Sequence, residues 1–423
     1  MRVFKFGGAS VKDAPAVRNV AKIIRNYTGQ PLVVVLSAMG KMTNAFEKLA
    51  AYSFEGNMNL YAGQLEMIQS FHRDILGNLF ADPKHKAYER ANRLFGEMKK
   101  LATSETKNTF DEWYDMLVPY GELLSTSIVS SFLENSDFRH ILLDARKLVR
   151  TNNIYRDAKV LWPETTTLIR QSVQEAILAD NFVLTQGFIG STPEGKNTTL
   201  GREGSDFTAS IFAYALDARE VVIWKDVPGL LNADPAIFRE TVKIDRLSYS
   251  DAIELAYYGA KIIHPKTIKP LQNKNIPLWI KSFSDPGLAG SLIQDSDEKY
   301  EAVPSYIYKF NQTLISISPR DFSFVNEENL IDIFGVFSSH RVRIKMMQNS
   351  AISFSVCIDG YDIGFKMLIQ ALQEKYKVKY NQNLELITIR NYDQGCIDKV
   401  VNSRTILLEQ RSRATVQLLV IPG

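Results

Sequence analysis

The chain has 423 residues, which is too long for one compact core, so two or three domains are expected. Hydrophobic residues make up 45% of it, and its net charge is only +3, with no dense run of lysine and arginine. These numbers favour complete folding and argue against a nucleic-acid-binding protein.

Cysteine usage and the apolar runs bear on the compartment. The two cysteines, Cys357 and Cys396, form no metal-binding or disulfide pattern, which fits a reduced cytoplasmic protein. The first residues, Met1–Gly8, lack the apolar core of a signal peptide, and no apolar run reaches the roughly 18 residues of a membrane helix. We therefore expect a cytoplasmic protein with no membrane partner.

The first strand is predicted at Val3–Phe6, a short apolar run that contains Lys5. Gly7 and Gly8 follow it, and Ser10 is the predicted N-cap of a helix. A lysine at the end of a strand, directly before a Gly-Gly turn and a helix start, is suited to bind an anion. An edge-strand lysine that points to solvent is the alternative.

A second strand ends in small hydroxyl residues. Pro31–Leu36 is a continuous apolar run, typical of a strand covered on both faces, and it leads into Ser37 and then Thr43. Such residues at the carboxyl end of a strand are where open α/β sheets bind ligands, although a turn with an N-cap explains them as well.

The mostly helical stretch 44–133 contains Glu122 at the head of an apolar-rich turn. The sequence leaves open whether the side chain of Glu122 is buried or lies on the surface.

A glycine-rich loop separates a predicted strand at Phe182–Leu184 from a helix predicted over Phe207–Leu216. Glycines and a helix N-terminus together let backbone N–H groups approach an anion, and Arg202 adds a forked donor for a carboxylate or phosphate. Asp206 falls in the first helical turn, where an acid suits the helix dipole. The alternative is a solvated loop followed by a capped helix.

Strands alternate with helices up to the last strand of this kind, predicted at Ile276–Ile280. This alternation predicts an α/β fold, a three-layer αβα sandwich with a mostly parallel sheet. Beyond the polar stretch Pro286–Glu301, our linker candidate, the pattern changes to short strands and helices typical of α+β ferredoxin-like units. The predicted domains are 1–295 and 305–423, the second made of two units of about 305–375 and 376–423.

Six segments, in this order, resemble the aspartate kinases, members of the amino acid kinase family that carry C-terminal ACT domains. They are Lys5-Phe6-Gly7-Gly8-Ala9-Ser10, Ser37-Ala38-Met39-Gly40 with Thr43-Asn44, Gly121-Glu122-Leu123-Leu124-Ser125, Thr199-Leu200-Gly201-Arg202-Glu203-Gly204-Ser205-Asp206, Trp224-Lys225-Asp226-Val227-Pro228-Gly229 through Asp234-Pro235, and Ala260-Lys261-Ile262-Ile263-His264-Pro265. Each segment alone is a weak signal, but six in register over nearly the whole chain are a strong one.

The resemblance implies that ATP phosphorylates the β-carboxylate of L-aspartate to 4-phospho-L-aspartate, the first step of lysine, threonine and methionine biosynthesis. It implies that Lys5 contacts the transferring phosphoryl group and that Asp206 is a catalytic organiser. The residues that it implies for aspartate binding are Ser37, Thr43, Glu122, Arg202 and Ser205. The residues that it implies for ATP binding are Lys5, Gly7, Gly8, Ser10, Lys225, Asp226, Leu231 and Lys261.

The charges of these residues suit such a reaction. The nucleophile is a carboxylate with a reference pKa of about 4, so it is ionised at neutral pH and needs no general base. His72 and His85 lie in polar helical stretches and are predicted to be exposed. The chemistry needs a cation for the phosphates, a cation for the α-carboxylate and an anion for the ammonium group, and Lys5, Arg202 and Glu122 have those charges. Mg²⁺ is expected to bridge phosphates and to keep most of its ligands as water, so no protein metal site is predicted.

The chain departs from the family's pattern at several places. Ala9 stands where the first loop usually has threonine, and Ala236 stands where an arginine commonly follows Asp-Pro. Lys345 and Ala351 take the places of acidic residues that lysine-inhibited members share, which predicts that lysine does not inhibit in that mode. The candidate effector-binding residues are Ser338, Gln348, Asn349 and Ser350.

Two other functions stay open on the sequence. One is another amino acid kinase, acting on glutamate, acetylglutamate or UMP, although the charges of Arg202 and Glu122 and the ACT-like tail argue against it. The other is a degenerate kinase that senses an amino acid without turnover, which only Ala9 and Ala236 support. As partners we expect L-aspartate, ATP, an amino-acid effector and further copies of the chain, in a homodimer or homotetramer.

Overall fold

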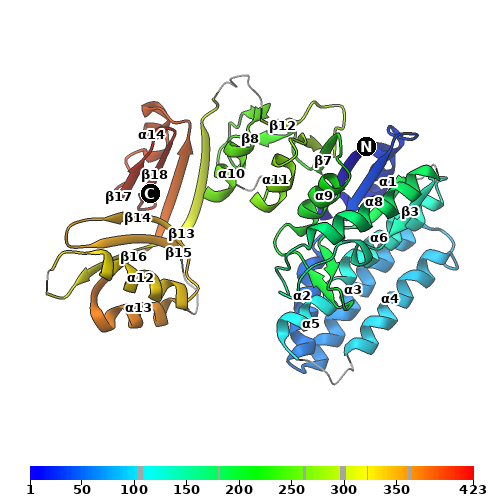
Figure 1. Ribbon diagram of the computed structural model, residues 1–423, viewed down its shortest axis with the longest axis horizontal. Helices are drawn as coiled ribbons and strands as arrows, with labels where there is room; N and C mark the ends of the chain where they lie inside the picture. The colour runs from blue at the N-terminus through cyan, green and yellow to red at the C-terminus, as the bar shows by residue number, and fades with distance from the viewer. Residues whose placement is uncertain (103–107, 180–181, 261–262, 296–301, 322, 361–363) are drawn as a thin grey trace. The chain divides into compact units, whose positions relative to one another are not determined.

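The computed structural model describes the chain except for residues 103–107, 180–181, 261–262, 296–301, 322 and 361–363 (Figure 1). It divides into two compact units. The first comprises Met1–Leu230, Lys243–Ile253 and Ile262–Lys299, and the second comprises Leu231–Val242, Glu254–Lys261 and Tyr300–Gly423. Part of the predicted linker, 296–301, and the predicted nucleotide-site residue Lys261 lie outside the described residues.

The elements up to residue 295 follow the predicted alternation of strands and helices. In chain order they are β1 (Arg2–Phe6), the 3-10 helix η1 (Gly8–Val11), α1 (Ala14–Arg25), β2 (Leu32–Leu36), α2 (Met42–Phe54), α3 (Met58–Leu79), α4 (Lys86–Ala102), α5 (Phe110–Leu117), α6 (Tyr120–Glu134), β3 (His140–Leu143), α7 (Ala145–Leu148), α8 (Trp162–Leu178), β4 (Phe182–Gln186), β5 (Ile189–Ser191), β6 (Asn197–Thr199), α9 (Gly204–Ala215), β7 (Glu220–Lys225), β8 (Leu230–Leu231), β9 (Lys243–Ile244), β10 (Arg246–Leu247), α10 (Tyr249–Tyr258), α11 (Pro265–Gln272), β11 (Leu278–Ser282) and β12 (Ser291–Ile293).

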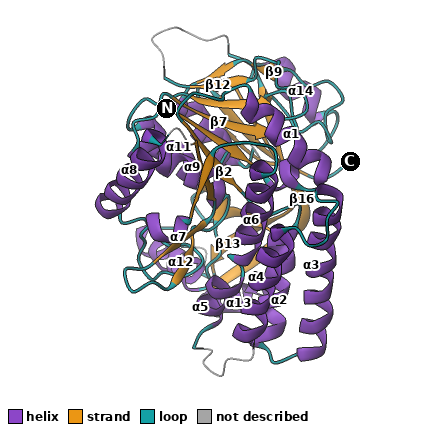
Figure 2. Cartoon of the chain, turned by 90° about the vertical axis from the view of Figure 1, so that its right-hand side faces the viewer, coloured by secondary structure: helices purple, strands orange, loops and turns teal. Residues whose placement is uncertain are grey.

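The first unit is built on an eight-stranded sheet with the order β10-β12-β11-β7-β1-β2-β4-β3. The neighbours from β11 to β3 are parallel, and β12 is antiparallel to β11. Figure 2 shows the strands between α8, α9 and α11 on one face and α1 and α6 on the other. The predicted three-layer αβα sandwich is therefore confirmed.

Alternation along the central strands explains why helices cover both faces. Phe4 and Phe6 of β1, with Val34 and Leu36 of β2, pack into one hydrophobic core with the helices α1 to α6. The intervening residues of these strands, such as Val33, are also fully buried, so both faces of each strand lie against apolar side chains.

The parallel register brings several strand ends to one edge of the sheet. Phe6 pairs with Leu36 and with Trp224, and Leu36 pairs with Gln186. The loops that follow β1, β2, β4 and β7 therefore leave the same edge, which is where open α/β sheets bind ligands.

Two local predictions about helices are wrong. Ser10 lies inside η1, and Asp13 instead caps α1, where its side chain accepts a hydrogen bond from the Ala16 N–H at 2.8 Å. His72, predicted to be exposed, is fully buried in α3 between the rings of Phe71 and Phe95. Gln69, Ser70, Arg73 and Asp74 are polar neighbours of His72 in the sequence, but its own position lies on the buried face of the helix.

One helical stretch, Phe110–Glu134, has the length and mean hydropathy of a membrane span. Most of it, 83% of the apolar window, is buried inside the protein, and its residues belong to the core around α5 and α6. Core helices of globular proteins commonly have these properties, so the stretch is weak support for a membrane span.

The second unit contains a six-stranded sheet with the order β14-β15-β13-β16-β18-β17, in which every pair is antiparallel. Its elements after residue 301 are β13 (Ser305–Pro319), α12 (Glu327–Ser339), β14 (Ile344–Asn349), β15 (Phe354–Asp359), α13 (Gly364–Lys375), β16 (Tyr376–Arg390), α14 (Gln394–Val401), β17 (Ile406–Arg411) and β18 (Thr415–Val420). Helices α12 and α13 contribute to one hydrophobic core and α14 to another. This antiparallel α+β arrangement is the one predicted for ACT-like units.

Candidate active site

A pocket of about 510 Å³ lies at the carboxyl edge of the first unit's sheet. Its walls come from the loops after β1, β2 and β4, from α2, α5 and α6, and from the start of α9. The predicted site residues that line it are Lys5, Gly8, Ser37, Thr43, Glu122, Arg202, Ser205 and Asp206. The structure thus brings together the predicted catalytic residues and all of the predicted aspartate-binding residues.

Lys5 and Asp206 form a buried ion pair in the wall of this pocket. The Lys5 Nζ lies 2.5 Å from the Asp206 Oδ1, and Asp206 is only 2% exposed. Burial raises the pKa of Asp206, but the positive charges of Lys5 and Lys225 outweigh burial and hold this pKa below its ordinary value. The carboxylate therefore stays ionised and fixes a lysine ammonium group at the end of β1.

Gly8 allows the loops after β1 and β2 to meet. A Cβ atom on Gly8 would lie 2.4 Å from the carbonyl oxygen of Gly40, and the Gly40 N–H donates a hydrogen bond to the Gly8 carbonyl at 2.9 Å. Only glycine can occupy this position without moving the neighbouring loop. The contact places the backbone of the first loop beside the segment that carries Ser37 and Thr43.

Glu122 is a buried acid whose carboxylate faces the pocket. It is 1% exposed, and its Oε1 accepts a long hydrogen bond, at 3.4 Å, from the Ala38 N–H. Its Oε2 is buried and has no hydrogen-bond partner among the described residues. Burial raises the pKa of Glu122 to about 8. A carboxyl group in this state is suited to receive a cationic group from a ligand.

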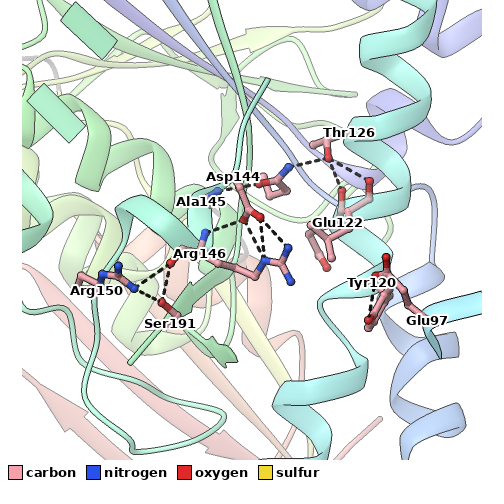
Figure 3. Close-up of polar contacts among 11 residues, drawn as sticks. Glu97, Tyr120, Glu122, Thr126, Asp144, Ala145, Arg146, Arg150 and Ser191 are labelled. Atoms are coloured by element: carbon pink, nitrogen blue, oxygen red, sulfur yellow. Dashed lines mark hydrogen bonds and ion pairs between the residues drawn. The ribbon is translucent and has the colours of Figure 1, made fainter. Parts of the chain in front are cut away.

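A chain of hydrogen bonds holds the helix of Glu122 in place from behind (Figure 3). The Thr126 hydroxyl donates to the Glu122 carbonyl at 2.9 Å, and the Gln186 amide donates to the Thr126 oxygen at 3.0 Å. The Gln186 oxygen accepts from the Ala145 N–H at 2.8 Å. These bonds tie α6 to the end of β4 and to the start of α7, so Glu122 projects from a rigid support.

Arg202 lies in a tight turn just before α9. The Gly204 N–H donates to the Gly201 carbonyl at 3.0 Å, and Glu203 has a left-handed backbone with φ of +54°. The Glu203 carboxylate accepts a hydrogen bond from the His264 N–H at 2.9 Å, at the N-cap of α11. The turn is therefore fixed on its outer side by α11.

Several residues predicted for the nucleotide do not line this pocket: Gly7, Ser10, Lys225 and Asp226. Three of them lie near it. A Cβ on Gly7 would lie 3.3 Å from the Lys5 Nζ, the Ser10 hydroxyl donates to the Trp224 carbonyl at 3.5 Å, and the charge of Lys225 acts on Asp206. Asp226 is exposed in the loop after β7. Leu231 belongs to the second unit, so its place relative to the pocket stays a prediction.

The four candidate effector residues lie in the second unit and are exposed. Gln348 and Asn349 end β14, Ser350 follows them in a turn, and Ser338 lies near the end of α12. Lys345, which we predict to stand where lysine-inhibited aspartate kinases have an acid, forms an ion pair of 2.8 Å with Asp359. The roles of these residues stay predictions.

The pocket also contains residues that the sequence did not mark as functional. Tyr114 on α5 donates its hydroxyl hydrogen bond to Glu47 on α2 at 2.6 Å, and both line the pocket. Arg156, from the loop between α7 and α8, lines it too, and its guanidinium carbon lies 4.6 Å from the centre of the Tyr114 ring. Arg156 lies in an irregular segment with φ of +65°, and no periodic pattern in the sequence points to it.

Comparisons with known proteins show which family the chain resembles. Residues 1–282 match the amino acid kinase family. The lysine-sensitive aspartokinase 3 of Escherichia coli is 31% identical over 408 residues, which cover 92% of this chain and 87% of that protein. The chloroplastic aspartokinase 1 of Arabidopsis thaliana is 29% identical, over 93% of this chain and 68% of that protein.

Solved structures of similar proteins cover the chain almost completely. The E. coli aspartokinase III in complex with lysine and aspartate, a T-state, superposes with a TM-score of 0.82 at 29% identity, covering 100% of this chain and 96% of that one. The same enzyme in complex with aspartate and ADP, an R-state, gives a TM-score of 0.81 at 28% identity, covering 99% and 96%.

Proposed function

The chain belongs to the amino acid kinase family, and on that premise we propose that it is an aspartate kinase, which phosphorylates the β-carboxylate of L-aspartate with ATP. The product, 4-phospho-L-aspartate, enters lysine, threonine and methionine biosynthesis. The observation that carries the proposal is the charge pattern of one pocket, where Lys5 and Arg202 lie together with the buried acid Glu122.

The reaction needs positive charge more than it needs a base. A β-carboxylate oxygen attacks the γ-phosphorus of ATP, and the bond from that phosphorus to the bridging oxygen breaks to release ADP. The nucleophile is already ionised at neutral pH. Two anionic reactants must approach each other, so a fixed cation at the reacting groups stabilises the transition state. Lys5, held by Asp206, supplies this charge, and the amides of the first loop add donors.

Substrate recognition follows from the complementary charges of aspartate. Arg202 binds the α-carboxylate with its forked donors, and Glu122 accepts the ammonium group at its Oε2, which has no hydrogen-bond partner among the described residues. The hydroxyl groups of Ser37, Thr43 and Ser205 complete the contacts. Binding of the ammonium group removes the penalty of the buried Glu122 oxygen, which favours substrates that carry that group.

The nucleotide is ATP, bound next to Lys5 by the first loop and by the residues at the end of β7. Groups of three or more metal-binding side chains are absent among the described residues. Mg²⁺ is expected to arrive with ATP, because it keeps most of its ligands as water and phosphate oxygens and needs no dedicated set of side chains. The ion would neutralise charge on the phosphates when it is bound with ATP.

We also propose a cytoplasmic location and assembly into a homodimer or homotetramer. Exposed apolar side chains in the second unit support a contact between copies: Phe324 is 75%, Ile331 is 73% and Met347 is 51% exposed.

An amino-acid effector at Ser338, Gln348, Asn349 and Ser350 would regulate the enzyme. We expect that lysine does not bind there through acidic residues, because Lys345 takes the place of one of them.

A substrate panel tests the proposed function. The purified chain is given ATP and Mg²⁺ with L-aspartate, L-glutamate, N-acetylglutamate or UMP, and any acyl phosphate is trapped with hydroxylamine. We expect turnover of L-aspartate with at least a tenfold preference in kcat/KM over L-glutamate, because one extra methylene displaces the reacting carboxylate by more than 1 Å, a misplacement that lowers rates by about 10²-fold. A preference for glutamate, or amino-acid binding with no turnover, would contradict the proposal.

A coupled assay tests the regulation separately. Lysine, threonine and methionine are added singly and together at fixed aspartate and ATP. Inhibition by one of them, lost in a Gln348→Ala/Asn349→Ala variant with unchanged basal kcat, supports the effector site. Equal inhibition of this variant and the wild type would place the effector elsewhere.

A further inference from the structure

The carboxylate of Asp115 on α5 is fully buried and makes three hydrogen bonds with two segments of the pocket wall. Its Oδ2 accepts from the Thr199 N–H at 2.9 Å and from the Arg156 N–H at 3.0 Å. Its Oδ1 accepts from the Thr199 hydroxyl at 2.6 Å. Asp115 itself does not line the pocket.

Both partners of Asp115 lead directly to arginines of the pocket. Arg156 lines the pocket itself, and Thr199 ends β6 three residues before Arg202. The two segments also contact each other, since the Ala158 N–H donates to the Thr199 carbonyl at 3.0 Å. Asp115 therefore holds, from one point, the two backbones that carry both guanidinium groups of the pocket.

The backbone of both segments needs such support. Arg156 adopts a left-handed conformation, with φ of +65°, which is unfavourable for a residue with a long side chain. Gly201, with φ of +76°, lies so close to the other segment that a Cβ on it would be 2.6 Å from the Asp157 Oδ1. Small shifts of either segment would therefore move an arginine relative to the pocket.

Helix α5 also holds the side chain of Arg156. The guanidinium group lies over the Tyr114 ring, and its Nη1 is 3.1 Å from the Asp111 Oδ1. Burial raises the pKa of Asp115 to about 6, while its hydrogen bonds with Thr199 and Arg156 favour the charged form. All the hydrogen bonds that Asp115 makes with described residues go to the two pocket segments, rather than to a neighbouring turn of α5.

We propose that Asp115 is a positioning residue for substrate binding, which fixes the backbones of the Arg156 and Arg202 segments so that both guanidinium groups stay at the wall of the pocket that receives aspartate. The proposal rests on the proposed function, since it assumes an aspartate substrate. Asp115 touches neither reactant, so its loss should act on the binding of aspartate more than on ATP or on the chemical step.

Steady-state kinetics of Asp115→Ala test this role. We expect the KM for aspartate to rise at least tenfold, with the KM for ATP and the kcat at saturating aspartate each within about threefold of wild type. Asp115→Asn keeps an oxygen for both N–H groups and should restore the KM to within about threefold. Thr199→Val, which removes one of the three bonds, should give an intermediate rise and keeps the test usable if Asp115→Ala does not fold.

Leu117→Ala is the matched control, because Leu117 is fully buried on the same helix and does not line the pocket. It should lower the thermal midpoint without raising the KM for aspartate. The inference is overturned if Asp115→Ala and Thr199→Val keep a wild-type KM, or if Leu117→Ala raises it equally. A wild-type chain that does not phosphorylate aspartate would overturn the proposed function as well, so the two failures are distinguishable.

Discussion

Single residues of the pocket carry charges that are buried and depend on one another. Lys5 is paired with Asp206, whereas the Glu122 carboxyl group keeps an oxygen without a partner among the described residues. A buried pair is stable only while both members are present, and a buried unpaired acid holds its proton until a cation arrives. The two sites therefore respond differently to substitution and to pH.

Lys5→Ala should lower kcat by about 10²–10³-fold, because the ammonium group stabilises charge in the transition state. It should also lower the free energy of unfolding by about 3–5 kcal/mol, since Asp206 loses its partner. In Lys5→Ala/Asp206→Asn both charges are gone, so much of the stability should return while kcat stays low. Urea unfolding and the coupled assay check this, with the exposed Lys22→Ala as control. Recovery of kcat in the double variant would refute the role of Lys5.

Arg202→Ala should raise the KM for aspartate by about 10- to 100-fold, the effect of losing charge-assisted hydrogen bonds to a carboxylate. The KM for ATP should stay near its wild-type value. Initial rates measured with each substrate varied in turn separate the two constants. If only the dependence on ATP changed, Arg202 would belong to the nucleotide site.

The raised pKa of Glu122 predicts that aspartate binds better as pH rises toward about 8. Below about pH 8 the Glu122 carboxyl group is protonated before aspartate binds. Each unit by which the pH rises toward 8 should therefore lower the KM for aspartate by up to about tenfold. Glu122→Gln should have a high KM that does not vary with pH, and the exposed Glu66→Gln should behave as wild type. A KM profile of wild type that is flat between about pH 6 and 8 would argue against this role.

The raised pKa of Glu122 also affects the free energy of unfolding when no substrate is bound. Between about 4.5, the ordinary pKa of the group, and about 8, the folded chain keeps a proton on Glu122 that the unfolded chain has released. The contribution of Glu122 to the free energy of unfolding should therefore fall as pH rises through this range. Urea unfolding of wild type and Glu122→Gln at several pH values would measure it.

Among the secondary-structure elements, those with strong apolar patterns could be predicted from the sequence. The strands β1 and β2 were predicted within one residue, because continuous apolar runs mark strands that are buried on both faces. Helix α14 was not predicted, because its buried residues Cys396, Ile397 and Val400 form a short pattern among polar residues. The full length of β16 could not be predicted from apolar residues, since most of its first half is exposed or half-buried.

The candidate site could be predicted only where a motif marks it. Lys5, Glu122 and Arg202 lie in segments with glycines and small residues next to strands or helix starts. Arg156 and Asp115 carry no such mark, because a left-handed loop residue and a buried acid on a helix gain their roles only from tertiary contacts. The burial of His72 likewise depends on how α3 packs.

The loops after β1 and β2 approach each other closely at Gly8, so a larger residue at this position should disturb both loops. Gly8→Ala should force the loops apart, lowering the free energy of unfolding by about 1–3 kcal/mol and kcat/KM by at least tenfold. Gly63→Ala on α3, where an added Cβ meets nothing within 4 Å, should leave kcat/KM unchanged and raise stability by about 0.5–1 kcal/mol. Wild-type kcat/KM in Gly8→Ala would show that the close approach of the loops is not required.

In the whole molecule, the proposed chemistry belongs to the first unit and the proposed regulation to the second. The pocket lies entirely within the first unit, and the candidate effector residues lie within the second. An effector bound at these residues should change the KM or kcat for aspartate through a coupling free energy between the two sites.

The central claim is that Lys5, Arg202 and Glu122 act on one bound aspartate. A crystal structure with L-aspartate and a non-hydrolysable ATP analogue tests it most directly. We predict the α-carboxylate at Arg202, the ammonium group at Glu122, and the Lys5 ammonium group within hydrogen-bond distance of the γ-phosphate. Aspartate bound outside this pocket, or with Arg202 turned to the nucleotide and Glu122 without a contact, would contradict the account.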